Sequence, residues 1–115
     1  MTRLHALIVE DHSTVALSLK SALSVMGFAT FGFASTAAQT LAAARARKPD
    51  LVVASLAIHS GLEGEALEAL AGAPVIYTAE PGAEFEGSEL VLERPIGRAA
   101  LSRALESLRA EAAAA

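Results

Sequence analysis

Polar side chains follow two short apolar runs of the sequence, as they do where a buried strand reaches the edge of a sheet. Glu10 and Asp11 follow the run Leu4 to Val9, and Ser55 follows the run Leu51 to Ala54. Adjacent carboxylates offer hard oxygen ligands for a divalent cation such as Mg²⁺. A serine hydroxyl becomes a nucleophile only where a neighbouring base activates it. These residue types therefore suggest metal binding or group transfer at the end of a sheet.

Two later apolar runs also end in polar residues. Thr78 follows the run Val75 to Tyr77, and Arg94 with Pro95 follows shortly after the run Leu90 to Leu92. The carboxyl ends of parallel strands meet at one edge of an open sheet, and sites form there. We therefore expect all of these polar side chains to share one edge, provided that the strands are parallel.

The elements that must position these residues alternate between short apolar runs and helical periodicity. Gly27 is placed to end the first predicted helix in a left-handed turn. Thr36 is placed to begin the second predicted helix, and Pro49 to end it. The alternation predicts an α/β fold, a doubly wound five-stranded parallel sheet with helices on both faces. The predicted strands are 4–9, 28–33, 51–54, 75–77 and 90–92, and the predicted helices are 13–26, 36–47, 63–70 and a last helix from 97 onward.

The connection between the fourth and fifth predicted strands departs from this alternation. Residues 79–88 include Pro81, Gly82 and Gly87, a composition that allows a turn or two of helix at most. We therefore expect the fourth helix of the alternation, the one due between these strands, to be shortened or missing.

Composition limits the class of protein. The chain has 115 residues, which predicts a single domain over residues 1–115, and it has no cysteine for a disulfide or a thiolate metal site. Its net charge is −4, and Arg45 to Lys48 is its longest basic stretch, so we expect no nucleic-acid binding. No apolar run approaches the ~20 residues of a membrane span, so we expect a soluble, cytoplasmic protein. Met1 and the terminal alanines favour a stand-alone domain.

Four segments, taken together, resemble the signature segments of response-regulator receiver domains of two-component signalling. They occur in the family's order, at mostly the family's spacing, and the resemblance runs from about Leu4 to Leu108. It implies a flavodoxin-like fold with strand order 2-1-3-4-5. The segments are Ile8–Asp11, Pro49–Leu56, Val75–Ala79 and Leu92–Ile96.

The resemblance also implies roles for individual positions. In the family, an acidic pair after the first strand holds Mg²⁺, and an aspartate ending the third strand accepts a phosphoryl group from a kinase histidine. A Ser or Thr follows the fourth strand, and a Lys-Pro pair, usually cis, follows the fifth. By position, Glu10 and Asp11 match the acidic pair, Thr78 the hydroxyl and Pro95 the proline. The chain departs from the family at the acceptor and at the lysine, where it has Ser55 and Arg94.

The serine at the acceptor position predicts that phosphotransfer fails. An acyl phosphate requires a carboxylate, whereas the hydroxyl of Ser55 is un-ionised at neutral pH and no base is evident beside it. The serine also removes an oxygen ligand and a negative charge from the metal site, so we expect no cofactor, or at most weak Mg²⁺ binding by Glu10 and Asp11. Arg94 could then bridge to Asp11 or Glu10 and replace the cation, because its charged fork takes a carboxylate bidentately.

The function predicted from these features is a phosphorylation-independent pseudo-receiver that is not an enzyme and acts by protein–protein contact in a phosphorelay or related pathway. Its expected partners are a histidine kinase, another regulator or a second copy of the chain. Two alternatives stay open: a working receiver whose acceptor has moved to Asp11 or Glu10, and a small-ligand binder at the same crevice.

Less specific interpretations of the same residues also stay open. Glu10 and Asp11 could be solvated acids at a strand end. Ser55 could pair with His59 as a nucleophile, although a loop hydroxyl is the favoured interpretation. Thr78 could do no more than bond to backbone.

Overall fold

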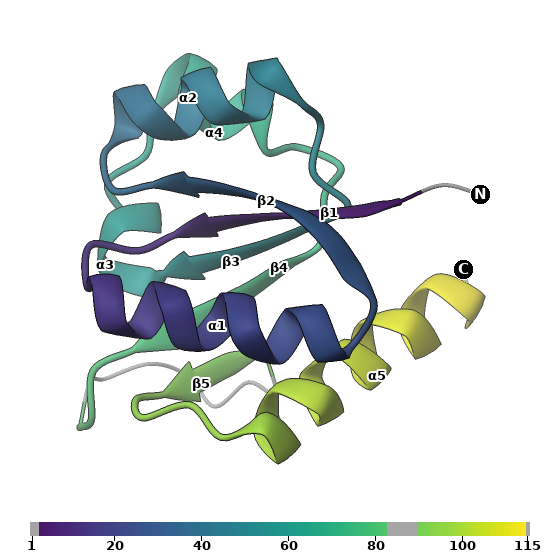
Figure 1. Cartoon of the computed structure of the whole chain (residues 1–115). Coiled ribbons are helices and arrows are strands. Elements are labelled where there is room, and N and C mark those ends of the chain that lie inside the picture. The colour runs from purple at the N-terminus through teal and green to yellow at the C-terminus, as the bar shows by residue number, and fades with distance from the viewer. Residues whose placement is uncertain (1–2, 83–89, 115) are drawn as a thin grey trace.

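The computed structural model shows a five-stranded parallel sheet covered by helices on both faces (Figure 1). It describes residues 3–82 and 90–114, without the side chains of residues 112–114. The strand order is β2-β1-β3-β4-β5, which confirms the predicted α/β fold and its topology. In chain order, the elements are β1 (Leu4–Val9), α1 (Ser13–Val25), β2 (Phe28–Ala34), α2 (Ala37–Ala46), β3 (Leu51–Ser55), α3 (Leu56–His59), α4 (Gly64–Ala69), β4 (Val75–Ala79), β5 (Val91–Glu93) and α5 (Arg98–Ala114).

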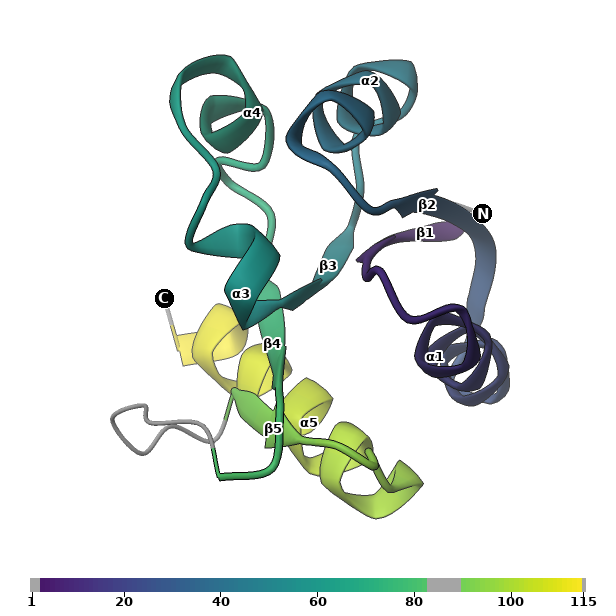
Figure 2. The same cartoon turned by 90° about the vertical axis from the view of Figure 1, so that its left-hand side faces the viewer.

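The central strands explain the continuous apolar runs of the sequence. Every residue of β3 is buried, and so are the last five residues of β1, because helices cover both faces of the sheet here. Figure 2 shows the two layers, with α1 and α5 on one side of the sheet and α2 and α4 on the other. β2 and β5 are the edge strands.

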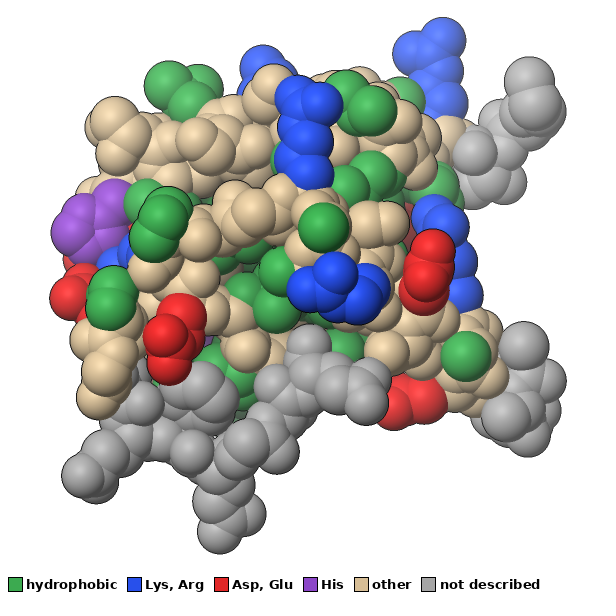
Figure 3. All heavy atoms as spheres, turned by 90° about the horizontal axis from the view of Figure 1, so that it is seen from below, with side chains coloured by type: hydrophobic (Ala, Val, Ile, Leu, Met, Phe, Trp, Pro, Cys, Tyr) green, Lys and Arg blue, Asp and Glu red, His purple; other side chains and the backbone are tan. Residues whose placement is uncertain are grey.

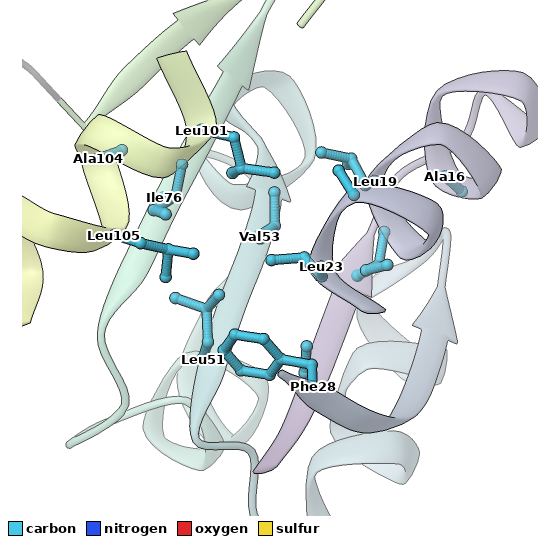
Figure 4. Close-up of a cluster of buried hydrophobic side chains, with 13 residues drawn as sticks. Ala16, Leu19, Leu23, Phe28, Leu51, Val53, Ile76, Leu101, Ala104 and Leu105 are labelled. Carbon is cyan, nitrogen blue, oxygen red and sulfur yellow. The ribbon is translucent and has the colours of Figure 1, made fainter. Parts of the chain in front are cut away.

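The larger core cluster lies between the sheet and the helices α1 and α5 (Figure 4). Leu23 from α1 and Leu101 from α5 meet Val53 and Ile76 from the sheet, and each side chain is at most 1% exposed. Phe28 is the one aromatic residue among the buried members of the cluster. The core is therefore mainly aliphatic, as the low aromatic content requires.

Two helix boundaries follow from single residues that the sequence marks. The Thr36 hydroxyl accepts a hydrogen bond from the backbone N–H of Gln39 at 3.1 Å, which caps the start of α2. Gly27 has a φ of 105°, a left-handed conformation that ends the helical region after α1.

The structure differs from the sequence prediction between β3 and α4 and at the end of β4. α3 is a single turn that begins directly after Ser55, where the sequence predicted no helix. β4 continues through Ala79, so Thr78 lies inside the strand and not after it. Of the connection to β5, Glu80 to Gly82 is not helical, and residues 83–89, on which the predicted shortening of the fourth helix depends, lie outside the described residues.

Within the described part of the chain, no helix combines the length and the apolar character needed to cross a bilayer. The face shown in Figure 3 carries scattered acidic and basic side chains and no broad basic patch.

Candidate functional site at the carboxyl edge of the sheet

The carboxyl ends of β1, β3, β4 and β5 bring the predicted site residues together. Asp11, Ser55, Thr78 and Arg94 all line one cavity of about 330 Å³. Ser55 and Thr78 are register partners on the neighbouring strands β3 and β4. Parallel pairing is what places residues so distant in the sequence at one edge, as the sequence prediction required.

The carboxylate of Glu10 is the centre of this site. Its side chain is 1% exposed, and the Nη2 atom of Arg94 donates to both of its oxygens, at 2.7 and 2.9 Å. The Thr78 hydroxyl donates to Glu10 Oε2 at 3.0 Å, and the backbone N–H of His12 donates to Oε1 at 3.3 Å. The buried charge is therefore neutralised and hydrogen-bonded entirely by protein groups.

Arg94 binds two carboxylates from its position after β5. Besides Glu10, its Nη1 atom donates to Glu80 Oε1 at 2.9 Å. Its side chain is 11% exposed, and the Arg94–Pro95 peptide bond is cis. The predicted bridge from Arg94 to an acidic residue of the first strand end is confirmed, with Glu10 and not Asp11 as the partner.

Asp11 lies at the open side of the cavity, where its side chain is 58% exposed. The Nε2 atom of His12 lies 3.6 Å from Asp11 Oδ1 and 3.6 Å from Glu80 Oε1. Sequence reasoning missed both His12 and Glu80. The available signal for Glu80 was its position directly after β4, at the same edge as the predicted site.

Comparison with solved structures gives matches over nearly the whole chain. The receiver domain of the PhyR response regulator from Erythrobacter litoralis superposes with a TM-score of 0.73 at 22% identity, over 93% of this chain and 90% of that one. The BeF₃-activated conformation of SdrG from Pseudomonas melonis Fr1 superposes with a TM-score of 0.67 at 26% identity, over 94% and 98%. The chain has the fold of a response-regulator receiver domain.

Further matches include longer proteins that share this receiver fold. The anti-anti-sigma factor PhyR from Bartonella quintana gives a TM-score of 0.69 at 19% identity, over 94% of this chain but only 50% of that one. This chain thus spans about half the length of that protein. No protein-family model matches the sequence, and no curated protein matches it.

The family's divalent cation does not fit the residues that this receiver fold presents. Ligand atoms of Glu10, Asp11 and His12 lie within 4.8 Å of one another, as in a metal site. However, both oxygens of Glu10 already accept bonds from Arg94, whose positive charge would lie beside any bound cation. Ser55, which ends β3, offers a neutral hydroxyl and no third carboxylate. Of the acidic pair, only the exposed Asp11 keeps a carboxylate that is free of the guanidinium.

Ser55 is the last residue of β3 and is 3% exposed. No described side chain that could act as a base is hydrogen-bonded to its hydroxyl. The ring of His59 instead meets the ring of Tyr77 edge-on, with centroids 4.9 Å apart, and burial lowers the pKa of His59. The structure therefore provides no contact for the alternative in which His59 activates Ser55, and His59 is the last residue of α3.

Proposed function

We propose that this chain is a pseudo-receiver: a domain of residues 1–115 that works without phosphorylation, by protein–protein contact, in two-component or phosphorelay signalling. The receiver fold and the receiver domains among its structural matches support the signalling context. The single observation that carries the proposal is the Glu10 carboxylate, which Arg94 and Thr78 already bind while a hydroxyl stands at the acceptor position.

The ion pair between Arg94 and Glu10 acts against phosphotransfer through its charge. A receiver uses its acidic pair and acceptor carboxylate to collect a cation, and the cation then supports attack on the phosphodonor. Here the guanidinium of Arg94 provides the positive charge permanently, and the nucleophilic carboxylate is missing. We expect no cofactor, with Mg²⁺ binding at most weakly through Asp11, and we expect no enzymatic activity.

The partners that this role requires are proteins: a histidine kinase, another regulator or a second copy of the chain. The matched PhyR proteins are response regulators or parts of them by their descriptions, which favours such partners here. We expect the domain to act in the cytoplasm, where phosphorelay proteins exchange their signals.

The first test is to incubate the protein with Mg²⁺ and a small phosphodonor and to measure its intact mass. We expect no phosphate adduct, because Ser55 lacks a carboxylate and Glu10 is bound to Arg94. An acid-labile adduct that disappears in Asp11→Asn would overturn the proposal and favour a working receiver with a moved acceptor.

A rebuilt site provides the positive control. The double variant Ser55→Asp with Arg94→Lys restores the acceptor carboxylate and a cation that makes fewer bonds to Glu10. We expect this variant, and neither single variant, to gain a Mg²⁺-dependent adduct of one phosphate. An adduct on the unchanged protein of equal yield would show that the ion pair does not silence the site.

A further inference from the structure

The cavity at the carboxyl edge of the sheet contains a buried hydroxyl group without a hydrogen-bond partner. Ser55 lines this cavity and is 3% exposed. Although it is the N-cap residue of α3, its side chain makes no capping hydrogen bond, and no described residue bonds to its hydroxyl. Within the described part of the chain, Arg94 Nε is the single unpartnered side-chain nitrogen or oxygen that is closed off from solvent, so the Ser55 hydroxyl is open to the cavity. Buried polar groups are normally hydrogen-bonded, so this hydroxyl points to a ligand with a polar group.

The same cavity has an excess of negative charge. The carboxylates of Asp11 and Glu80 line it, and their side chains are 58% and 69% exposed. Arg94 also lines the cavity, but its single positive charge is already shared between Glu10 and Glu80. The three carboxylates therefore exceed the charge of the one guanidinium while His12 is neutral. The cavity consequently favours a cation and repels an anion.

A primary ammonium group at the end of a methylene chain fits this lining. An ammonium group has three N–H donors, and the cavity offers acceptors on Ser55, Asp11 and Glu80. Leu56 and Ala57 provide an apolar wall, along which methylene groups would lie. A bare Mg²⁺ ion would leave that wall and most of the 330 Å³ unused, and it requires several oxygen ligands in close octahedral geometry. The cavity therefore favours a long basic side chain over a metal ion.

We propose that this cavity receives a lysine side chain of a partner protein, with its ammonium group bound by Ser55, Asp11 and Glu80. Both carboxylates are largely exposed, so a lysine on the surface of another protein can reach them. The inference rests on the proposed function and deepens it, because it names the chemistry of one contact by which a protein partner is recognised.

The test is an NMR titration of the full chain, labelled with ¹⁵N, at about pH 8, where histidine side chains are neutral. The probe is N-acetyl-lysine methylamide at about 0.1 to 100 mM. We expect saturable shifts of the amide signals of Ser55, Asp11 and Glu80. N-acetyl-norleucine methylamide has the same methylene chain without the charge, and it should give no saturable shift. A lysine probe that does not bind, or a norleucine probe that binds equally, would overturn the inference.

Two variants test the named contacts. Asp11→Asn should raise the dissociation constant of the lysine probe at least about fivefold, because it removes an exposed carboxylate of the cavity. Ser55→Ala should raise it about threefold, because it removes the hydroxyl acceptor. The matched control is Glu65→Gln, which removes an exposed carboxylate of α4 outside the cavity and should leave the dissociation constant unchanged. Circular dichroism establishes that the variants are folded, and equal weakening by Asp11→Asn and Glu65→Gln would contradict a specific site.

Butylammonium distinguishes a lysine side chain from a free amine. We expect the lysine probe to bind at least as tightly as butylammonium, and butylammonium that binds about tenfold more tightly would overturn the assignment to a protein side chain. The titration contains no phosphodonor, so its failure would leave the phosphorylation result as it is. Conversely, a phosphate adduct on Asp11 would overturn the pseudo-receiver and leave lysine binding to the unmodified chain unchanged.

Discussion

The two ends of the sheet both carry charged side chains, but they use them differently. At the amino end, the charges bond to backbone: Asp50 Oδ2 accepts from the His5 N–H at 2.8 Å, and Arg47 donates to the Arg3 carbonyl at 3.2 Å. At the carboxyl end, Arg94 and Glu10 bond to each other in a buried pair. The first arrangement joins loops to strands, and the second neutralises a carboxylate whose side chain is only 1% exposed.

The difference shows that burial decides whether a charge requires a charged partner. Asp50 is exposed, and a water molecule could take its place at modest cost. Glu10 is buried, and a buried charge without a partner is costly. The buried carboxylate of Glu10 therefore requires the paired guanidinium of Arg94.

The largest effect should come from breaking the carboxyl-end pair. Arg94→Ala leaves Glu10 charged and buried, and we expect it to lower the free energy of unfolding by about 3 kcal/mol, measured by urea titration. Adding Glu10→Gln to Arg94→Ala should recover part of the loss, because the uncompensated charge is then gone.

The control for this prediction is an exposed ion pair elsewhere in the chain. Arg45 and Glu65 are 3.1 Å apart, with side chains 62% and 70% exposed. Arg45→Ala should therefore cost at most about 0.5 kcal/mol. If both arginine variants lost the same stability, the buried pair would have no special role.

An intermediate effect should come from the amino end. Asp50→Ala removes the charged acceptor of the His5 N–H, and we expect it to lower the free energy of unfolding by about 1.5 kcal/mol. The same denaturant titration measures it, with Asp50→Asn retaining a side-chain acceptor and part of the stability. A loss as large as that of Arg94→Ala would contradict the distinction between the two ends.

The smallest effect should be a pH dependence that originates at the amino end. Burial, and then the charge of Arg47, lower the pKa of His5, whose Nδ1 lies 2.8 Å from Thr30 Oγ1. The unfolded chain therefore binds a proton at a higher pH than the folded chain does. Stability contributed by neutral His5 is fully present above the unfolded pKa of about 6.5 and is lost as the pH falls below it.

Unfolding measured between pH 7.5 and 5.0 tests this directly. His5→Gln should reduce the fall in stability over this range. Burial lowers the pKa of His59 in the same direction, so His59→Gln should also reduce the fall, and the two histidines should contribute independently. An undiminished fall in the His5 variant would show that this histidine does not titrate on unfolding.

The sequence predicted the elements that strong local signals define. Thr36 and Gly27 have chemical reasons to start and end helices, and the apolar run of β3 has no other stable place than the middle of a sheet. α3 was missed because four residues are too few to show helical periodicity. The strand order came from the family resemblance, since local patterns do not specify which strands are neighbours.

For the site, the sequence predicted which residues meet but not which way they point. Glu10 and Asp11 are adjacent and chemically similar, so residue type does not decide that Glu10 is buried against Arg94 whereas Asp11 is exposed. The contact between Arg94 and Glu80 depends on the path of the chain after β4, which composition does not determine.

The hydrogen bond from Thr78 to Glu10 has a consequence for how such a domain could convey information. A hydroxyl that already donates its proton to a buried carboxylate can turn elsewhere only if that cluster opens. If opening costs about 3 kcal/mol, the rearranged population is below about 1% of molecules. A partner protein that binds the minor form would then have to supply that energy through contacts that only the minor form offers.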